Sequence, residues 1–221
     1  MSLILADRFH PRLRREQQAA IDAGQIHKRD EVELLAPEQF RPLILYSLLL
    51  LFVGGIFFVA LTIASLIWHL RTNTFTLYVT SIWPVLLWAG INIISYIVIL
   101  PVHEIIHALA FMLWGGRPHF GARLPMVLYC GAREQLFRRN QYLVVGLAPL
   151  VVITIAGIVL TLLAPVAASY VLFATVGNVS GAAGDIWVVA RLLRQPRHVL
   201  VEDTQIGYRV WEIPTDNSSV T

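Results

Sequence analysis

Long segments without charged residues constrain the fold of this chain more than any other feature of its sequence. The chain is 57% hydrophobic and only 14% charged, whereas about a quarter of the residues in soluble domains are charged. A helix of about 20 apolar residues crosses the hydrocarbon core of a bilayer. The second apolar region, residues 77–114, would make a helix of about 57 Å, too long for one straight crossing, so either its span begins near Pro84 or the helix is broken. The pattern predicts an all-α membrane protein with a bundle of about four transmembrane helices, at residues 43–70, 84–114, 142–163 and 169–190.

The positive charges predict how the chain crosses the membrane. Seven Lys and Arg residues precede the first span, five lie in the 117–140 loop, four follow from Arg191 onward, and Arg71 alone falls on the other side. Loops rich in Lys and Arg stay in the cytosol. We therefore expect a multi-pass protein of the plasma membrane with both termini cytosolic. Its parts are a cytosolic N-terminal tail (1–42), a transmembrane domain (43–193) and a cytosolic C-terminal tail (194–221).

The polar segments between and beyond the spans give weaker signals. The N-terminal tail is expected to form short helices on the membrane surface or to be partly disordered. Short apolar runs at residues 119–132 predict strands or a hairpin, and alternation over residues 199–213 predicts a small cytosolic β-hairpin. The net charge of +3 and pI near 9.3 do not indicate a nucleic-acid partner, because the basic residues flank the apolar runs. The bilayer itself is the expected partner.

The segment from His103 to His107 reads H-E-I-I-H and lies inside the second apolar run. Residues four apart share one face of a helix, so both imidazoles can bind one Zn²⁺. Glu104 lies beside them, where its carboxylate can take a proton from an attacking water. Charged and imidazole groups are costly in hydrocarbon and mark functional sites there. The motif therefore predicts a zinc metalloprotease that hydrolyses membrane-associated protein or peptide substrates near the cytosolic face.

Asp185 is the predicted third zinc ligand. Catalytic zinc usually has three protein ligands, and Glu104 and Asp185 are the only acidic residues inside the predicted spans. His107 and Asp185 are expected at similar depth, each about 10 Å from the cytosolic end of its helix. Small residues at 180–184 would let the two helices approach closely. Asn178 lies two turns before Asp185. It is a candidate to hydrogen-bond a zinc ligand or the oxyanion of the reaction. Alternatively, it is simply a polar residue between packed helices.

Other residues and functions fit the pattern less well. Glu134 lies among arginines in a loop, and His119 is expected to be an ordinary loop residue. The single cysteine, Cys130, excludes an internal disulfide framework and a cysteine-based zinc site. A metal transporter would need polar residues along a path on both sides of the site, and a catalytically inactive metal-binding scaffold would not need Glu104. Both remain alternatives, and the sequence leaves the oligomeric state open.

At these residues the chain resembles the site-2-protease-like intramembrane zinc metalloproteases. More closely, it resembles the small bacterial membrane proteins classed as putative zincin peptidases. The resemblance rests on Pro101 before H-E-x-x-H-A-L-A-F, on the pair Ala148-Pro149, and on the pattern of Asn178, Gly181, Gly184 and Asp185. It covers about residues 43–195 and implies a bacterial zinc protease with His103, His107 and Asp185 as ligands and Glu104 as the base. Asp185 departs from the site-2 pattern, since Gly precedes it and Ile follows it.

Overall fold

In the described part of the chain, four helical segments are long and apolar enough to cross a membrane. The computed structural model describes residues 3–34, 36–71, 81–123, 127–204 and 207–214. The four helices are α2 (Pro37–Leu70), α3 (Trp83–Leu113), α4 (Arg139–Leu163) and a fourth span, Leu172–Leu192. The fourth consists of α6 (Leu172–Gly181) and α7 (Ala183–Leu192). Helices that could cross a membrane thus lie at the four predicted positions, and the start of the second apolar run, up to residue 80, lies outside the described residues.

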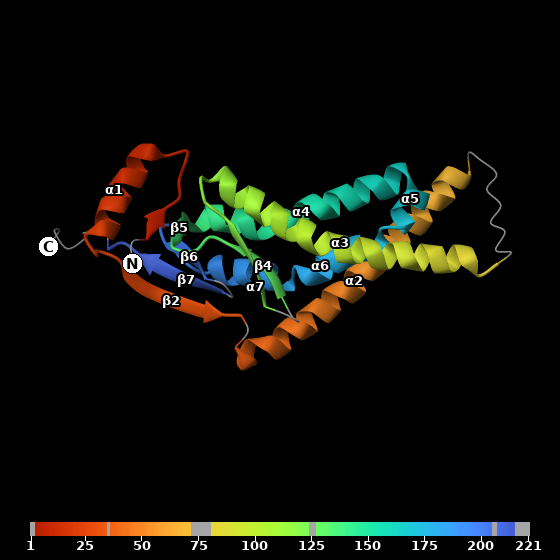
Figure 1. The fold of residues 1–221 in the computed structure, drawn as a ribbon, viewed down its shortest axis with the longest axis horizontal. Coiled ribbons are helices and arrows are strands. Elements are labelled where there is room, and N and C mark those ends of the chain that lie inside the picture. Colours follow the sequence, from red (N-terminus) through yellow and green to blue (C-terminus); the bar gives the residue numbers. More distant parts are fainter. Residues whose placement is uncertain (1–2, 35, 72–80, 124–126, 205–206, 215–221) are drawn as a thin grey trace. The chain divides into compact units, whose positions relative to one another are not determined.

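The structure is mostly helical but not purely all-α, because the polar segments also form β-structure. A five-stranded sheet has the order β1-β5-β6-β7-β2 (Figure 1), and β3 and β4 form a separate pair. The strands are β1 (Ile4–Leu5), β2 (His27–Glu33), β3 (His119–Arg123), β4 (Val127–Gly131), β5 (Gln135–Arg138), β6 (Leu200–Thr204) and β7 (Gly207–Glu212). The two predicted hairpins are thus present, as the antiparallel pairs β3–β4 and β6–β7. The larger sheet arises because the first 33 residues add β1 and β2 to its edges.

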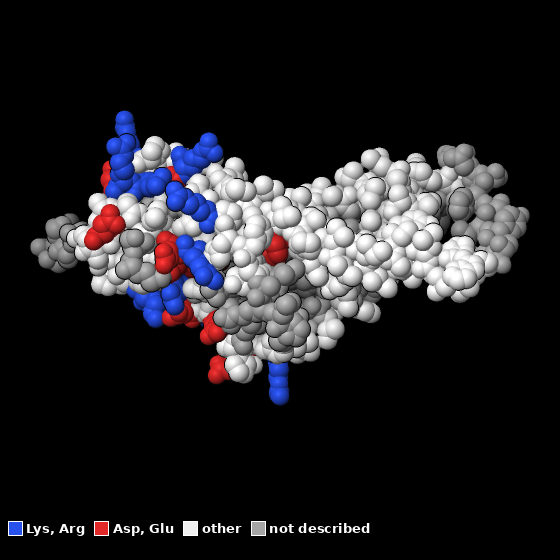
Figure 2. Space-filling model, in the orientation of Figure 1, with Lys and Arg blue, Asp and Glu red and all other residues white. Residues whose placement is uncertain are grey.

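The described chain divides into two compact units. The sheet unit comprises residues 1–40, 104–148 and 185–221, and the helical unit comprises residues 41–103 and 149–184. On the face shown in Figure 2, Lys, Arg, Asp and Glu side chains gather over the elements of the sheet unit. In the sequence of the helical unit, Arg41 and Arg71 are the only residues of these four types. Its large apolar side chains, such as Phe52 and Trp68, are 66% and 71% exposed, as expected of a surface that faces lipid.

Within the sheet unit, the ends of three helices pack on one face of the sheet. Buried Phe111 of α3, Val145 of α4 and Val188 of α7 belong to one core with Val201 of β6 and Tyr208 of β7. Burial of such side chains is the main force that holds the sheet on the helix ends. This packing fixes the helix ends that follow the H-E-x-x-H segment and Asp185.

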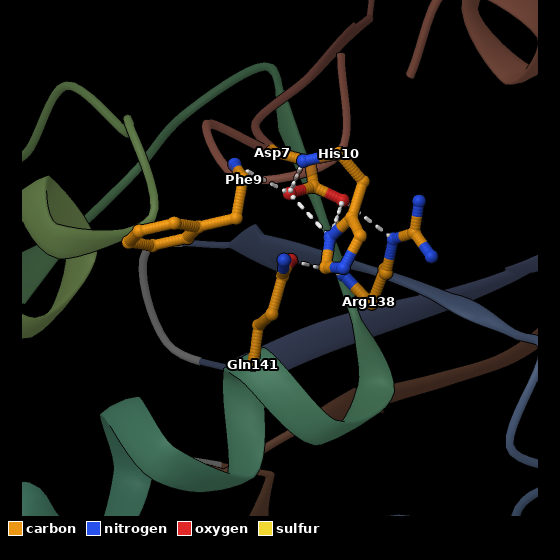
Figure 3. A network of polar contacts seen from close by, with 5 residues as sticks. All are labelled: Asp7, Phe9, His10, Arg138 and Gln141. Atoms are coloured by element: carbon orange, nitrogen blue, oxygen red, sulfur yellow. Dashed lines mark hydrogen bonds and ion pairs between the residues drawn. The ribbon is translucent and has the colours of Figure 1, made fainter. Parts of the chain in front are cut away.

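The N-terminal segment is tied into the sheet unit by Asp7 (Figure 3). Its carboxylate, fully buried, accepts backbone N–H groups of Phe9 and His10 and pairs with Arg138 at 2.8 Å. Burial opposes its charge, but the His10 side chain and the Arg138 charge outweigh it and lower the pKa of Asp7. Helix α1 (Pro11–Asp22) follows directly. Residues 3–22 are therefore an ordered part of the unit, and of the two expected forms of this tail, short helices or partial disorder, they include a short helix.

Within the helical unit, α2 packs through one stripe of its surface. Its buried residues are Gly54, Phe58, Thr62 and Ser65, spaced so that they share one face of the helix. A side chain at Gly54 would lie 3.2 Å from Val179 of α6, and Ser65 donates to the carbonyl of Thr161 in α4 at 2.7 Å. Small residues allow this close approach, which is how helices associate in membranes.

Asn92 joins α3 to the irregular connection before the fourth span. Its side chain is fully buried, donates to the Ser169 carbonyl at 3.0 Å and accepts the Phe173 N–H at 3.0 Å. Ser169 ends the short helix α5 (Pro165–Ser169), and Phe173 lies in the first turn of α6. Asn92 thus pairs backbone groups that two helix ends leave without a helical partner.

We expect Asn92→Ala to lower the apparent melting temperature of the protein in detergent, because it leaves the Phe173 N–H and the Ser169 carbonyl with one partner fewer. The free energy of unfolding should fall by about 1–3 kcal/mol, the cost of leaving a buried polar group of this kind without its partner. Ser95→Ala is the matched control, since the Ser95 hydroxyl bonds only within α3, to the Asn92 carbonyl. Equal melting temperatures for Asn92→Ala and Ser95→Ala would contradict this role.

Candidate metal centre

Helix α3 carries both histidines and the glutamate of the H-E-x-x-H segment. His103 and His107 are one turn apart and therefore share a face. The helix ends at Leu113, six residues after His107, and Gly115 follows with a φ of 86°. Glycine adopts this left-handed conformation without the strain that a side chain would cause. The Gly115-Gly116 pair thus ends the helix, which places His107 close to the sheet unit's core.

His107 is held by contacts on both sides of its ring. It is buried, and its Nδ1 lies 2.9 Å from the backbone carbonyl of Val145 in α4. A carbonyl only accepts, so Nδ1 carries the proton and donates it. Nε2 then has the lone pair that a metal requires, and it lies 3.5 Å from Oδ1 of Asp185.

His103 is oriented in the same way by a different acceptor. Its Nδ1 lies 2.9 Å from Oδ1 of Asn178 in α6, so here too Nδ1 donates and Nε2 presents the lone pair. Asn178 is itself 97% buried, with 3% of its surface exposed. Histidines that bind metals commonly have their second nitrogen fixed by such a partner.

One ligand atom from each of His103, His107 and Asp185 lies within 4.8 Å of the others. The described part of the chain holds no other group of three or more His, Cys, Asp or Glu residues with this spacing. Two imidazoles and one carboxylate form a donor set that suits Zn²⁺ and leaves a fourth position for water. Asp185 lies in the first turn of α7, just after the helix is interrupted at Ala182. The residues present therefore fit a single zinc ion.

Glu104 is held by β4, through a contact that the sequence did not indicate. Its Oε2 accepts the backbone N–H of Cys130 at 2.6 Å. Hydrogen bonds from N–H groups to a carboxylate are short and strong, so this bond fixes the orientation of the carboxylate. The sequence indicated a hairpin at 119–132 but gave no sign that its backbone reaches Glu104, because such a contact involves no side chain of β4.

The other candidate residues lie apart from this group. Glu134 is exposed in the turn before β5, with a φ of 58°, and His119 lies in β3.

Burial, with the charges of Glu104 and Asp203, raises the pKa of the Cys130 thiol to about 12. The thiol therefore stays protonated, and a protonated thiol is neither a nucleophile nor a good metal ligand.

Asp203 of β6 is a further buried carboxylate that sequence reasoning missed. Burial raises its pKa from 3.8 to about 7, although the Tyr142 hydroxyl and the Ala132 N–H favour its charged form. A raised pKa in the folded state means that the ionised group opposes folding. Its favourable contribution is complete below about pH 4 and is lost as the pH rises toward about 7.

We therefore expect the free energy of unfolding of the wild type to rise relative to that of Asp203→Asn as the pH falls from about 8 to about 5, by an amount on the order of a few kcal/mol. The difference in melting temperature between the two proteins, measured at each pH, checks this. Asp7→Asn is the matched control. The lowered pKa of Asp7 keeps that residue ionised in folded and unfolded chains over this range, so its difference from wild type should not change. If the difference in melting temperature between wild type and Asp203→Asn did not change with pH, the raised pKa of Asp203 would be contradicted.

Comparison with known proteins agrees with this chemistry. No curated protein and no solved structure matches the chain. Residues 96–200 match the model of a family described as "putative zincin peptidase". The matched region contains His103, Glu104, His107, Asn178 and Asp185, and it ends before Asp203. This similarity supports a zincin-like family and a zinc metallopeptidase activity for the chain.

Proposed function

We propose that the protein is a membrane-embedded zinc metalloprotease that hydrolyses peptide bonds of membrane-associated substrates near the cytosolic face. The observation that carries this proposal is the matched orientation of the two histidines. Both donate Nδ1–H to a fixed acceptor, so both keep the lone pair of Nε2 for a metal, and both belong to the group that includes Asp185. A polar cluster that only joined helices would have no need for this arrangement.

In this proposal His103, His107 and Asp185 hold the zinc. When bound, zinc would polarise the scissile carbonyl and make water a better nucleophile. Glu104 takes the proton of the attacking water and delivers it to the leaving amine. The Cys130 N–H donates to one carboxylate oxygen, which limits the orientations that the carboxylate can adopt for these transfers.

Asn178 suits two tasks in the same reaction. Its Oδ1 orients His103. Its Nδ2 is buried and has no hydrogen-bond partner among the residues that the structure describes. An amide N–H in this position can donate to the oxyanion that forms at the scissile carbonyl.

The same elements support a site on the cytosolic side of the membrane and a substrate that binds in an extended conformation. The excess of Lys and Arg in both terminal segments and in the 117–140 loop supports a cytosolic sheet unit. A peptide must leave its helical conformation before its carbonyl can react. Among the described residues β3 and β4 form a two-stranded sheet of their own, and a strand edge of this kind is suited to bind such an extended segment by backbone hydrogen bonds.

The test combines zinc analysis with cleavage of a membrane-spanning test peptide by the purified protein in detergent or liposomes. We expect about one zinc per chain, loss of cleavage on treatment with a strong chelator, and recovery on addition of Zn²⁺. Bound zinc without cleavage of any membrane peptide would favour the inactive scaffold. Movement of zinc across liposomes would favour the transporter.

A further inference from the structure

Two carboxylates of the sheet unit accept hydrogen bonds from the backbone at the end of β4. Glu104 of α3 accepts the N–H of Cys130 at 2.6 Å, and Asp203 of β6 accepts the N–H of Ala132 at 2.9 Å. Cys130 lies in β4 and Ala132 directly follows its last residue. Backbone N–H groups two residues apart point to the same side of an extended strand, about 7 Å from one another. The carboxylates therefore bind neighbouring positions on one edge of the chain.

Asp203 is the fixed member of this pair. It lies in a central strand of the five-stranded sheet, where it pairs with Tyr208 of β7, and it is 8% exposed. Its second oxygen accepts the hydroxyl of Tyr142 at 2.6 Å. A side chain at Gly131 would collide with Asp203 Oδ2, so the strand and the carboxylate fit closely.

Glu104 is held by the backbone of the same strand. Its side chain is half-buried, and a glutamate has several rotatable bonds. The Cys130 N–H can hold it in one orientation only if β4 itself stays in place. The bond from Ala132 to Asp203 is the nearest described attachment of β4 to the central sheet along that edge. The central sheet is thus connected to Glu104 by two hydrogen bonds, one from the Ala132 N–H to Asp203 and one from the Cys130 N–H to Glu104.

We propose that Asp203 is a positioning residue for Glu104, acting through β4, and that the sheet unit thereby sets the geometry of the proposed base. This inference rests on the proposed function of Glu104. The described hydrogen bonds of Asp203 are those with the Ala132 N–H and the Tyr142 hydroxyl, and its charge also interacts with His107. Its loss should let β4 shift, so that the Cys130 N–H no longer fixes the carboxylate. The turnover rate should then fall while zinc binding and substrate affinity stay.

The first measurement compares kcat, KM and zinc content in three variants. Asp203→Ala should lower kcat by about 10- to 100-fold, as displacement of a catalytic group by about 1 Å does, with KM and zinc content near wild type. Asp203→Asn keeps an oxygen for the Ala132 N–H and should restore most of kcat. Asp7→Ala removes another buried carboxylate of the same unit that does not contact β4, and it should keep kcat. Wild-type kcat in Asp203→Ala would overturn the proposal, and so would equal losses in Asp203→Ala and Asp7→Ala.

The second measurement needs no activity, and it separates this inference from the proposed function. Hydrogen–deuterium exchange of the peptide that carries the Cys130 and Ala132 amides should speed up in Asp203→Ala and stay near wild type in Asp203→Asn and Asp7→Ala. Unchanged exchange in Asp203→Ala would overturn the proposal. If wild type neither binds zinc nor cleaves peptides, the proposed function fails. The exchange of the Cys130 amide then decides alone whether Asp203 holds β4 against Glu104.

Discussion

Replacement of Glu104 by Gln should abolish most peptidase activity while the protein keeps its zinc. Gln has nearly the same shape and retains an oxygen that can accept the Cys130 N–H, but it cannot take a proton from water. Loss of a general base lowers the rate by about 10²- to 10⁴-fold. Zinc content should be unchanged, because Glu104 is not part of the ligand group. Steady-state cleavage of the test peptide, with zinc analysis of the same samples, checks both expectations.

Glu134→Gln is the matched control for that experiment. Glu134 is exposed in the turn before β5, so the same chemical change there should leave kcat near wild type. A Glu104→Gln protein that cleaves at the normal rate would show that another group takes the proton. A variant that lost its zinc would instead make Glu104 a ligand.

Replacement of Asp185 by Ala should weaken zinc binding by at least about 100-fold. Loss of a group that merely supports a ligand already costs about 10- to 100-fold in metal affinity, and removal of a ligand should cost more. The helix should tolerate Ala, because Asp185 lies in the first turn of α7 and is partly exposed. Competition with a zinc chelator of known affinity measures the change.

His119→Ala is the control for zinc binding, because His119 lies in β3 and does not belong to the ligand group. Its zinc affinity should equal that of wild type. If Asp185→Ala retained full zinc occupancy against the competing chelator, Asp185 would not be the third ligand. The two histidines would then need a different partner.

The membrane helices and the two histidines could be predicted from the sequence because both depend on local patterns. A span is a long apolar run, and His103 and His107 share a face through the helical repeat alone. Asp185 could be predicted by a second argument, because charged residues inside hydrocarbon are rare and costly. Helix α3 ends just before the Gly115-Gly116 pair, and a glycine after a helix is also a local signal.

The sheet could not be predicted as a whole, because its partners lie at opposite ends of the chain. Strand β2 pairs with β7 across nearly the full sequence, and only Val32 in it is buried. Such a charged edge strand lacks the alternation that identifies strands. The contacts of Glu104 with Cys130, and of His107 with Val145, involve backbone groups. Backbone groups leave no mark in the sequence, so the support of the proposed site was visible only in the structure.

The most direct test of the central claim is the zinc X-ray absorption spectrum of the wild-type protein. Zinc held by His103, His107 and Asp185 should show only nitrogen and oxygen neighbours at about 2.0–2.2 Å. The outer-shell signal should correspond to two imidazoles. Absence of bound zinc, or a sulfur neighbour at about 2.3 Å, would contradict the proposed metal centre.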